Sequence, residues 1–285
     1  MSGQILDVPH PTPSAPLRLR PAARPMRRLP SQADWPAGQT IAVQCGLFVG
    51  LVLLWEVGAR LGVVDVFFWS QPSSVAETLL VFFSTGTALV DIRVTFTETI
   101  LGFVLGTSLG AAIGLSFWWS RNWARVLQPY IVIAESIPKL ALAPLIILVF
   151  GLGLASKVAI ATALTLIVTT ITTHGGVKAI DPDGERLFYS LGASRRQVFL
   201  KFVVPSCLPW IISILRVNIG LALTGAVVGE FIASERGLGR TIFYAGQTYE
   251  IALVWVAVLV LATLSVAMYV AVAALERYLG RKAHR

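Results

Sequence analysis

Charged side chains are scarce in this sequence. Asp, Glu, Lys and Arg make up 13% of the 285 residues, about half of their share in an average soluble domain. Hydrophobic residues make up 55%, and several runs reach the ~20 apolar residues that a helix needs to cross a bilayer. Because a chain in lipid must satisfy its own backbone hydrogen bonds, the composition excludes an ordinary soluble domain. It predicts an all-α polytopic membrane protein.

Residues that hold metals or carry catalysis are also few. The chain has two cysteines, Cys45 and Cys207, and three scattered histidines, so no cluster has the spacing of metal ligands. The segment GLGLASK lacks the second glycine of a Walker A motif, because Ser156 occupies that position. We expect no metal, no cofactor and no enzymatic activity on this chain. Any ATP hydrolysis would belong to a separate subunit.

The first 40 residues differ from the rest. They hold eight of the fifteen prolines and five arginines, and such a segment buries too little apolar surface to fold alone. We expect a disordered cytoplasmic tail over residues 1–40, which helps to orient the first span or attracts anionic membrane lipid. A transmembrane domain follows over residues 41–285. The net charge of +8 does not imply a nucleic-acid partner, because cytoplasmic loops of membrane proteins are basic.

Six apolar runs predict six membrane spans. They cover about residues 41–61, 95–117, 131–150, 157–173, 211–231 and 251–275. If both termini are cytoplasmic, the segments on that side hold sixteen Lys and Arg residues and the opposite segments hold five. This asymmetry satisfies the positive-inside rule. We therefore expect a multi-pass protein of the cell (inner) membrane with both termini in the cytoplasm.

Two spans carry periodic small or polar residues. The second span has a glycine at every fourth position, a stripe that lets helices approach closely in lipid; its members are Gly102, Gly106, Gly110 and Gly114. The fourth span has a threonine face, which either lines a polar translocation path or bonds back to its own helix carbonyls. Its members are Thr162, Thr165, Thr169 and Thr172.

Charged residues inside spans are functional candidates by default. Glu135 and Lys139 stand four residues apart in the order that favours a helical ion pair. Arg216, in the fifth span, can attract an anionic solute or extend its guanidinium to the membrane surface. All three are candidates for the translocation path, and pairing or snorkelling is the simpler alternative.

One polar and basic segment lies between two long apolar runs. It is DPDGERLFYSLGASRRQVFLKFVVPSCLP, residues 181–209. Gly192 can end one helix in a left-handed conformation, and Ser194 with Gln197 forms a capping box for a second helix. Pro205 and Pro209 are expected to break or kink the chain. The pattern predicts a helix-turn-helix that exposes apolar residues to a partner, with a solvated basic loop as the alternative. These apolar residues are Phe188, Leu191, Val198 and Phe199.

This segment resembles the cytoplasmic coupling loop, or EAA loop, of ABC importer permeases. The family pattern is Glu-Ala-Ala, three residues, Gly, nine residues, Ile, one residue and Leu-Pro. Its Gly, Ile, Leu and Pro positions correspond here to Gly192, Phe202, Val204 and Pro205. The opening triplet departs from the pattern, because residues 186–188 read Arg-Leu-Phe and Glu185 comes one position early.

The resemblance extends over about residues 69–276. The stretch IPKLALAPLIILVFGLGLASK is similar to the Pro-x-x-Ala-Leu-x-Pro-Leu…Phe-Gly-x-Gly pattern of the nitrate, sulfonate and taurine permease branch. WSQPSSVAETL, LRVNIGLAL and GEFIASERGLG resemble its outer segment, its fifth span and the loop that follows. Glu98 is a departure, because that branch often has an arginine four residues before the Gly-Phe pair.

The resemblance implies a type I ABC importer. Two permease subunits, as a homodimer or as a pair with a similar chain, would form the path for a small, anionic solute such as nitrate, a sulfonate or taurine. An external substrate-binding protein would deliver the solute, and two ATPase subunits would bind ATP and Mg²⁺. The coupling loop, about residues 175–209, would sit in an ATPase groove. The residues assigned to this contact are Asp183, Glu185, Arg186, Leu191, Gly192, Ala193, Ser194, Val198, Phe199 and Pro205.

Two other classes of protein are alternatives to an ABC importer permease. A standalone secondary carrier would transport without ATP, although the two halves show no clear repeat of the kind such carriers have. An intramembrane enzyme would need ionisable residues at matching depth. The available ones are Glu98, Glu135, Lys139 and Arg216, and their spacing is poor for chemistry.

Overall fold

The structure is a computed structural model that describes residues 36–283. It divides into two compact units, Met1–Val49 and Gly50–Arg285, and helix α1 (Ala37–Arg60) crosses the boundary between them. In the described part of the first unit, the residues from Gly38 to Val49 are all exposed. Residues 1–35 of the predicted tail, which was expected over residues 1–40, lie outside the described residues. The last residues of this tail differ from the prediction, because helix α1 already begins at Ala37.

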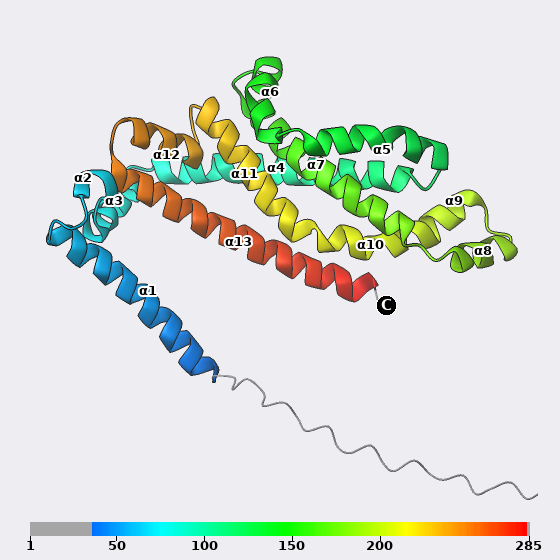
Figure 1. Cartoon of the computed structure of the whole chain (residues 1–285), viewed down its shortest axis with the longest axis horizontal. Helices are drawn as coiled ribbons and strands as arrows, with labels where there is room; N and C mark the ends of the chain where they lie inside the picture. The colour runs from blue at the N-terminus through cyan, green and yellow to red at the C-terminus, as the bar shows by residue number, and fades with distance from the viewer. Residues whose placement is uncertain (1–35, 284–285) are drawn as a thin grey trace, which may run out of the picture. The chain divides into compact units, whose positions relative to one another are not determined.

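The second unit is built from helices throughout its described part (Figure 1). After α1 the α-helices are α2 (Val66–Trp69), α3 (Pro72–Ser84), α4 (Thr87–Ser116), α5 (Arg121–Ser136), α6 (Ala143–Phe150), α7 (Leu154–Lys178), α8 (Pro182–Ser190), α9 (Arg195–Val198), α10 (Val204–Ser213), α11 (Leu215–Ile232), α12 (Leu238–Gln247) and α13 (Ile251–Ala283). A 3₁₀ segment, η1 (Lys139–Leu142), precedes α6, and a π-helical segment, η2 (Phe199–Val203), precedes α10.

Five described helices are long and apolar enough to cross a membrane: α1, α4, α7, α11 and α13. The number rises to six if the bent pair of α5 with η1 and α6 counts as one span. The predicted third span is therefore not straight, because its two halves meet at 86°. Pro138 explains the bend, since it disfavours the α conformation of the residue before it. Ile137 accordingly has an extended backbone, with φ −71° and ψ 131°.

The centre of the unit is a close contact between α4 and α7. Each glycine of the stripe on α4 lies against a small or β-branched residue of α7; the pairs are Gly102 with Ala161, Gly106 with Thr165, Gly110 with Thr169 and Gly114 with Thr173. A Cβ atom at Gly110 would lie 2.5 Å from the carbonyl oxygen of Leu166. The two backbones can approach this closely because the glycines have no side chain. Helix α11 then packs on both α4 and α7.

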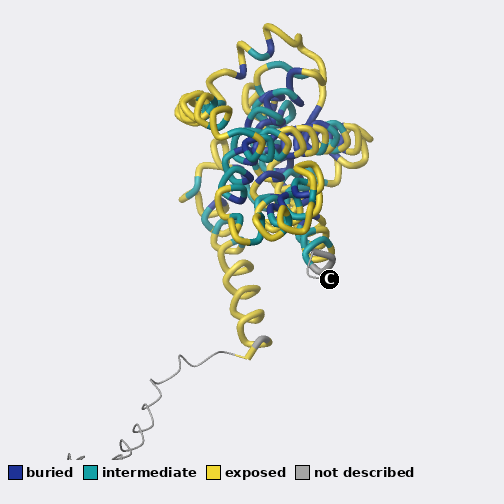
Figure 2. The backbone as a smooth tube through the Cα atoms, turned by 90° about the vertical axis from the view of Figure 1, so that its right-hand side faces the viewer, coloured by how far each residue is buried: buried dark blue, intermediate teal, exposed yellow. Residues whose placement is uncertain are grey.

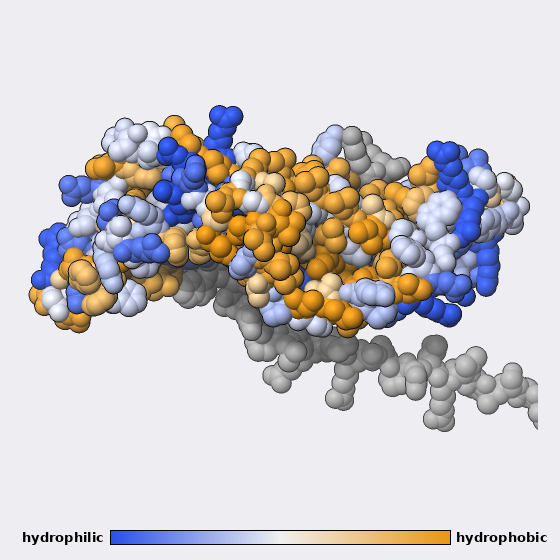
Figure 3. Space-filling model, turned by 90° about the horizontal axis from the view of Figure 1, so that it is seen from above, coloured by the Kyte–Doolittle hydropathy of each residue, from blue (hydrophilic) through white to orange (hydrophobic). Residues whose placement is uncertain are grey.

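Buried residues gather in the interior of the bundle, as Figure 2 shows, and many of them belong to α4, α7 and α11. On the face seen in Figure 3, apolar residues gather over the middle and hydrophilic residues lie towards two ends. An apolar band between polar ends is the pattern of a protein that spans a bilayer.

Candidate functional site

The segment that resembles the coupling loop forms a helical hairpin over residues 182–203, called here the hairpin. Helix α8 begins after Asp181, whose carboxylate accepts a hydrogen bond from the backbone N–H of Asp183 at 3.0 Å. It ends before Gly192, which has the left-handed φ of +78°. Ser194 and Gln197 then form the predicted capping box at the start of α9. Local capping chemistry thus sets both helices and the turn between them.

The chain does not break at the two prolines that follow the hairpin. Helical structure continues from α9 through η2 into α10, with Pro205 in its first turn and Pro209 inside it. Of the two predicted alternatives, a break or a kink, the break is therefore wrong. In the π-helical segment the N–H of Val204 donates to the carbonyl of Phe199, five residues earlier. This wider turn comes directly before Pro205, a position where an α-helix would lose one hydrogen bond and gain a clash.

An apolar core holds the hairpin to the membrane helices. Val198, Val203 and Cys207 are fully buried in it, and residues of α4 and α7, including Leu115 and Val177, pack around them. Val198 was predicted to contact a partner, and this prediction is wrong because the side chain faces this core. Phe199, predicted to be exposed as well, is half-buried in the same cluster.

Aromatic rings close this core on two sides. The ring of Phe202 lies 5.1 Å from that of Phe188, centroid to centroid, and joins the two arms of the hairpin. Phe199 lies 5.2 Å from the ring of Trp119, in the turn after α4. Arg195 donates to the carbonyl of Trp119, and its guanidinium lies 5.3 Å from the centre of that ring. The hairpin is thereby fixed to the turn between α4 and α5.

The outer surface of the hairpin carries exposed apolar residues. Leu187, Tyr189 and Leu191 expose 58%, 43% and 77% of their surface, and we call them the exposed apolar set. Apolar side chains held out on a rigid polar hairpin can fill a groove of a partner protein. Of the ten predicted coupling residues, most others are exposed too: Asp183, Arg186, Gly192, Ser194 and Pro205. Glu185 and Ala193 are half-buried.

The predicted threonine face lies within the helix bundle. Thr165 and Thr169 are fully buried, and Thr169 donates to the carbonyl of Thr165 at 2.7 Å. The side-chain amide of Asn218 donates to Thr169 at 2.7 Å and to Thr107 at 2.9 Å. These hydroxyls therefore join α4, α7 and α11. The hydroxyl of Thr162 is buried and makes no hydrogen bond within the described chain.

The charged residues predicted for the path have other partners. Lys139 donates to the backbone carbonyl of Glu135 at 3.2 Å. The expected helical ion pair is absent from the described chain, because α5 ends at Ser136, between the two residues. Arg216 forms an ion pair with Glu276 of α13 and lies 6.0 Å from the ring centre of Tyr269.

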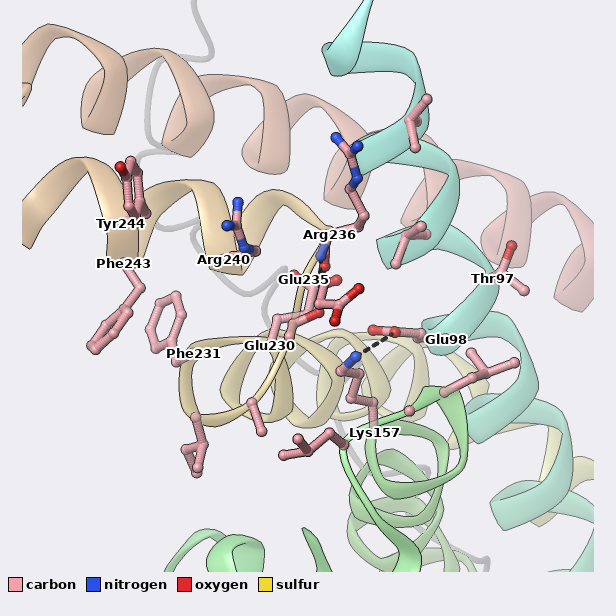
Figure 4. A pocket seen from close by; sticks show the side chains of 18 of the residues that line it. Thr97, Glu98, Lys157, Glu230, Phe231, Glu235, Arg236, Arg240, Phe243 and Tyr244 are labelled. Carbon is pink, nitrogen blue, oxygen red and sulfur yellow. Dashed lines mark hydrogen bonds and ion pairs between the residues drawn. The ribbon is translucent and has the colours of Figure 1, made fainter.

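A cavity of about 1080 Å³, lined by apolar and charged residues, lies at the opposite end of α7 from the hairpin. It is lined by α4, α7, α11, α12 and the loop before α12. Figure 4 shows Glu98, Lys157 and Glu230 converging at its base. The ammonium of Lys157 lies 3.5 Å from Oε1 of Glu98, and all three side chains are buried. Sequence reasoning missed this cluster because the three residues come from three separate segments.

The loop before α12 is fixed by carboxylates of α4 and α11. Glu230 accepts hydrogen bonds from the Thr95 hydroxyl and from the N–H of Gly239, each at 2.6 Å. Asp91 accepts from the N–H of Gly237 at 3.0 Å and from the Thr241 hydroxyl at 3.1 Å. Gly237 has a φ of +117°, which few other residues adopt. The cavity wall is therefore a defined part of the fold.

Comparisons with known proteins agree with this architecture. Residues 99–282 match the family model of the binding-protein-dependent transport system inner membrane component. The chain is 37% identical to the riboflavin transport permease RibX of Chloroflexus aurantiacus, covering 93% of this chain and 96% of that protein. It is 28% identical to the taurine transport permease TauC of Escherichia coli, over 86% and 91% of the two chains.

Among solved structures, a chain of a bacterial ABC transporter for import of the polysaccharide alginate superposes with a TM-score of 0.60. It shares 12% sequence identity, and the match covers 84% of this chain and 96% of that chain. At this identity the match shows a common fold. The family match over most of the chain shows more: this protein belongs to the binding-protein-dependent transport system inner membrane components, the permease subunits of ABC importers.

Proposed function

We propose that the hairpin docks on a separate ATPase subunit and couples ATP hydrolysis there to solute import through this permease. The observation that carries the proposal is the exposed apolar set, Leu187, Tyr189 and Leu191, on a hairpin that is held to the membrane helices by a buried core. ATP and Mg²⁺ would bind to the ATPase subunit. The permease would contribute the docking surface and the membrane helices that move.

The packing of the hairpin gives a route for this movement. Val177, near the end of α7, packs on the hairpin core, whereas Lys157, near its start, lines the cavity. The two positions are ~30 Å apart along a helix that rises 1.5 Å per residue. Closing of the ATPase dimer would shift the hairpin, and α7 would carry the displacement across the membrane. A nucleotide that binds the closed ATPase dimer more tightly than the open dimer shifts the equilibrium of the whole assembly towards the closed state. The size of the shift is set by the difference between the two affinities.

The complete importer would contain further chains. We infer two permease copies, two ATPase subunits and an external substrate-binding protein, with the hairpin and both termini in the cytoplasm. The asymmetry of sixteen Lys and Arg residues against five supports this orientation. The cavity end of the bundle would then face the binding protein.

The transported solute is proposed to be small, organic and anionic. The cavity is lined by four basic side chains and three acidic ones; they are Arg93, Lys157, Arg236 and Arg240, and Glu98, Glu230 and Glu235. This excess of basic groups favours an anion. The named relatives, permeases for riboflavin and for taurine, handle small organic molecules. Because riboflavin and taurine differ chemically, the relatives do not indicate the charge of the solute. The proposal that the solute is an anion therefore depends on the charge of the cavity.

The test is to purify the tagged chain gently from its own membrane and to identify by mass spectrometry what accompanies it. An ABC ATPase at an equimolar ratio, with ATP-dependent uptake after reconstitution, is the expected result. The alternative is a standalone secondary carrier. Uptake by vesicles that contain this chain alone, driven by an ion gradient and insensitive to ATP, would favour the carrier and refute the proposal.

A further inference from the structure

A second cavity, of about 600 Å³, is lined by residues of α1, α2, α13 and the loop after α1. Helix α2 lies at the end of the second unit opposite the hairpin, as Figure 1 shows. Three tryptophans line the cavity, and we call it the aromatic cavity; they are Trp55, Trp69 and Trp255. Asp65 is the one charged residue among the described residues that line it. Indole rings beside a carboxylate attract a cation, because the face of the ring is electron-rich.

The wall of the aromatic cavity has a defined shape. The indole N–H of Trp255 donates to the backbone carbonyl of Trp69 at 2.9 Å, which joins α13 to α2. The rings of Trp55 and Trp255 lie 5.1 Å apart, centroid to centroid. The backbone N–H of Trp69 donates to the carbonyl of Asp65 at 3.0 Å. Because these contacts already order the wall, a bound molecule loses little affinity to ordering it.

The groups that attract a cation hold none within the described chain. Oδ1 of Asp65 accepts from the N–H of Phe67 at 2.9 Å, but Asp65 forms no ion pair with any described residue. No described Arg or Lys lies over the rings of the three tryptophans. Asp65 is exposed, and Trp69 exposes 56% of its surface. The carboxylate and at least one indole are therefore accessible to a cation from outside the chain.

The aromatic cavity also has an apolar side. Leu51 and Leu54 of α1 line it and expose 58% and 70% of their surface. They belong to a helix that is long and apolar enough to cross a membrane, and tryptophans are typical of the membrane–water interface. The cavity thus joins a surface suited to hydrocarbon with a surface suited to a cation. A free cation would leave the leucines uncovered, whereas a phospholipid with an ammonium head group has a part for each side.

We propose that the aromatic cavity binds a phospholipid whose head group carries an ammonium, such as phosphatidylethanolamine or phosphatidylcholine. The ammonium would lie over the ring of Trp69 and beside the carboxylate of Asp65. An acyl chain would follow Leu51 and Leu54 along α1. Phosphatidylglycerol lacks the ammonium, and its net negative charge is repelled by Asp65. This lipid site is separate from the hairpin and from the cavity at Lys157, so it does not depend on the proposed function.

The experiment uses the full chain, purified in mild detergent with the subunits that accompany it, and three phospholipids with identical acyl chains. Phosphatidylethanolamine and phosphatidylcholine carry the ammonium, and phosphatidylglycerol does not. The protein is incubated with an equimolar mixture, and native mass spectrometry identifies the lipids that stay bound. We expect each ammonium lipid to be retained about fivefold over phosphatidylglycerol, which is the effect of about one cation–π contact.

Two variants test the residues of the site. Asp65→Asn removes the charge, while asparagine still caps α2 in place of the aspartate. Trp69→Leu removes the ring and keeps the backbone carbonyl that accepts from Trp255. In each variant the preference should fall to about twofold or less, because one of the two cation acceptors is lost.

Two control variants change the same residue types outside the aromatic cavity. Glu77→Gln removes an exposed carboxylate from α3. Trp123→Leu removes an indole that is 48% exposed from α5. Both should keep the preference of the unaltered chain.

Equal retention of the three lipids by the unaltered chain, or a preference for phosphatidylglycerol, would overturn the site. A preference that survives in full in Asp65→Asn and in Trp69→Leu would overturn it too, since the ammonium lipids would then bind elsewhere. Tetramethylammonium separates a free cation from a lipid. If it protects the protein against thermal unfolding while the three lipids are retained equally, the cavity holds a free cation and the lipid assignment is overturned.

Discussion

The ring of Phe202 lies against the backbone of Gly184, so that a Cβ atom at Gly184 would come within 2.6 Å of the ring Cζ atom. The two residues lie on opposite arms of the hairpin, and their contact leaves no room for a side chain. The ring of Phe202 also contacts that of Phe188. The hairpin is thus held in one shape by a close contact that depends on a glycine.

We predict that Gly184→Ala uncouples ATP hydrolysis from uptake. The added methyl group displaces the Phe202 ring, and overpacking of this kind costs about 1–3 kcal/mol. Uptake per ATP hydrolysed, measured in proteoliposomes, should fall several-fold. Gly175→Ala is the matched control, because its Cβ would meet Trp210 at an ordinary 3.7 Å. Equal coupling ratios in the two variants would contradict the prediction.

The turn between the arms gives a second prediction. Gly192 has a φ of +78°, and its N–H donates to the carbonyl of Tyr189 at 3.0 Å. Gly192→Pro removes this hydrogen bond and fixes φ near −65°, so ATPase-driven uptake should be lost. Gly192→Asn should retain most of it, since asparagine tolerates the left-handed conformation. This difference is checked by uptake assays on both variants, normalised to the amount of each variant in the membrane. Normal coupling in the proline variant would refute the prediction.

A third prediction concerns the contact between α4 and α7. A Cβ at Gly110 would lie 2.5 Å from the Leu166 carbonyl oxygen and 2.7 Å from Cβ of Thr169. We expect Gly110→Ala to destabilise the protein by about 1–3 kcal/mol. The same substitution at Gly220 meets nothing within 4 Å and should be neutral or stabilising by up to about 1 kcal/mol. Thermal unfolding in detergent compares the midpoints of the two variants. Similar midpoints would show that α4 and α7 do not pack this closely.

The thiol of Cys207 gives a prediction about pH. It is fully buried in the hairpin core, and burial raises its pKa to about 11. In a Cys45→Ser background, maleimide should label the folded protein far more slowly than the unfolded protein at pH 8. Between the unfolded and folded pKa values the folded state holds the extra proton, so the contribution of Cys207 to stability falls as pH rises towards 11. Rapid labelling of the folded protein at pH 8 would show that this core is open.

Local signals predicted much of the fold. Apolar length located the spans, and the glycine spacing marked one face of α4. Gly192, Ser194 and Gln197 located the turn of the hairpin, because capping depends on residues close in sequence. Each of these signals is contained in one short segment.

Features set by distant contacts could not be predicted. Val198 is apolar on a four-residue helix, which is too short for periodicity to show which side faces the core. The path through Pro205 depends on a π-helical turn that no simple pattern indicates. Glu98, Lys157 and Glu230 meet only because α4, α7 and α11 pack together. The one available signal was that Glu98 lies four residues before Gly102, on the face of the stripe.

The exposed apolar set is expected to contact an ATPase in the assembled transporter. A photo-crosslinking amino acid at Leu191, which is 77% exposed, can capture this contact when cells that express the whole transporter are irradiated. We expect a crosslinked product in which mass spectrometry identifies ABC ATPase peptides. The same probe at Leu152, 72% exposed and lining the cavity, should give no such product. An ATPase crosslink from Leu152, or none from Leu191, would show that the hairpin is not the docking surface.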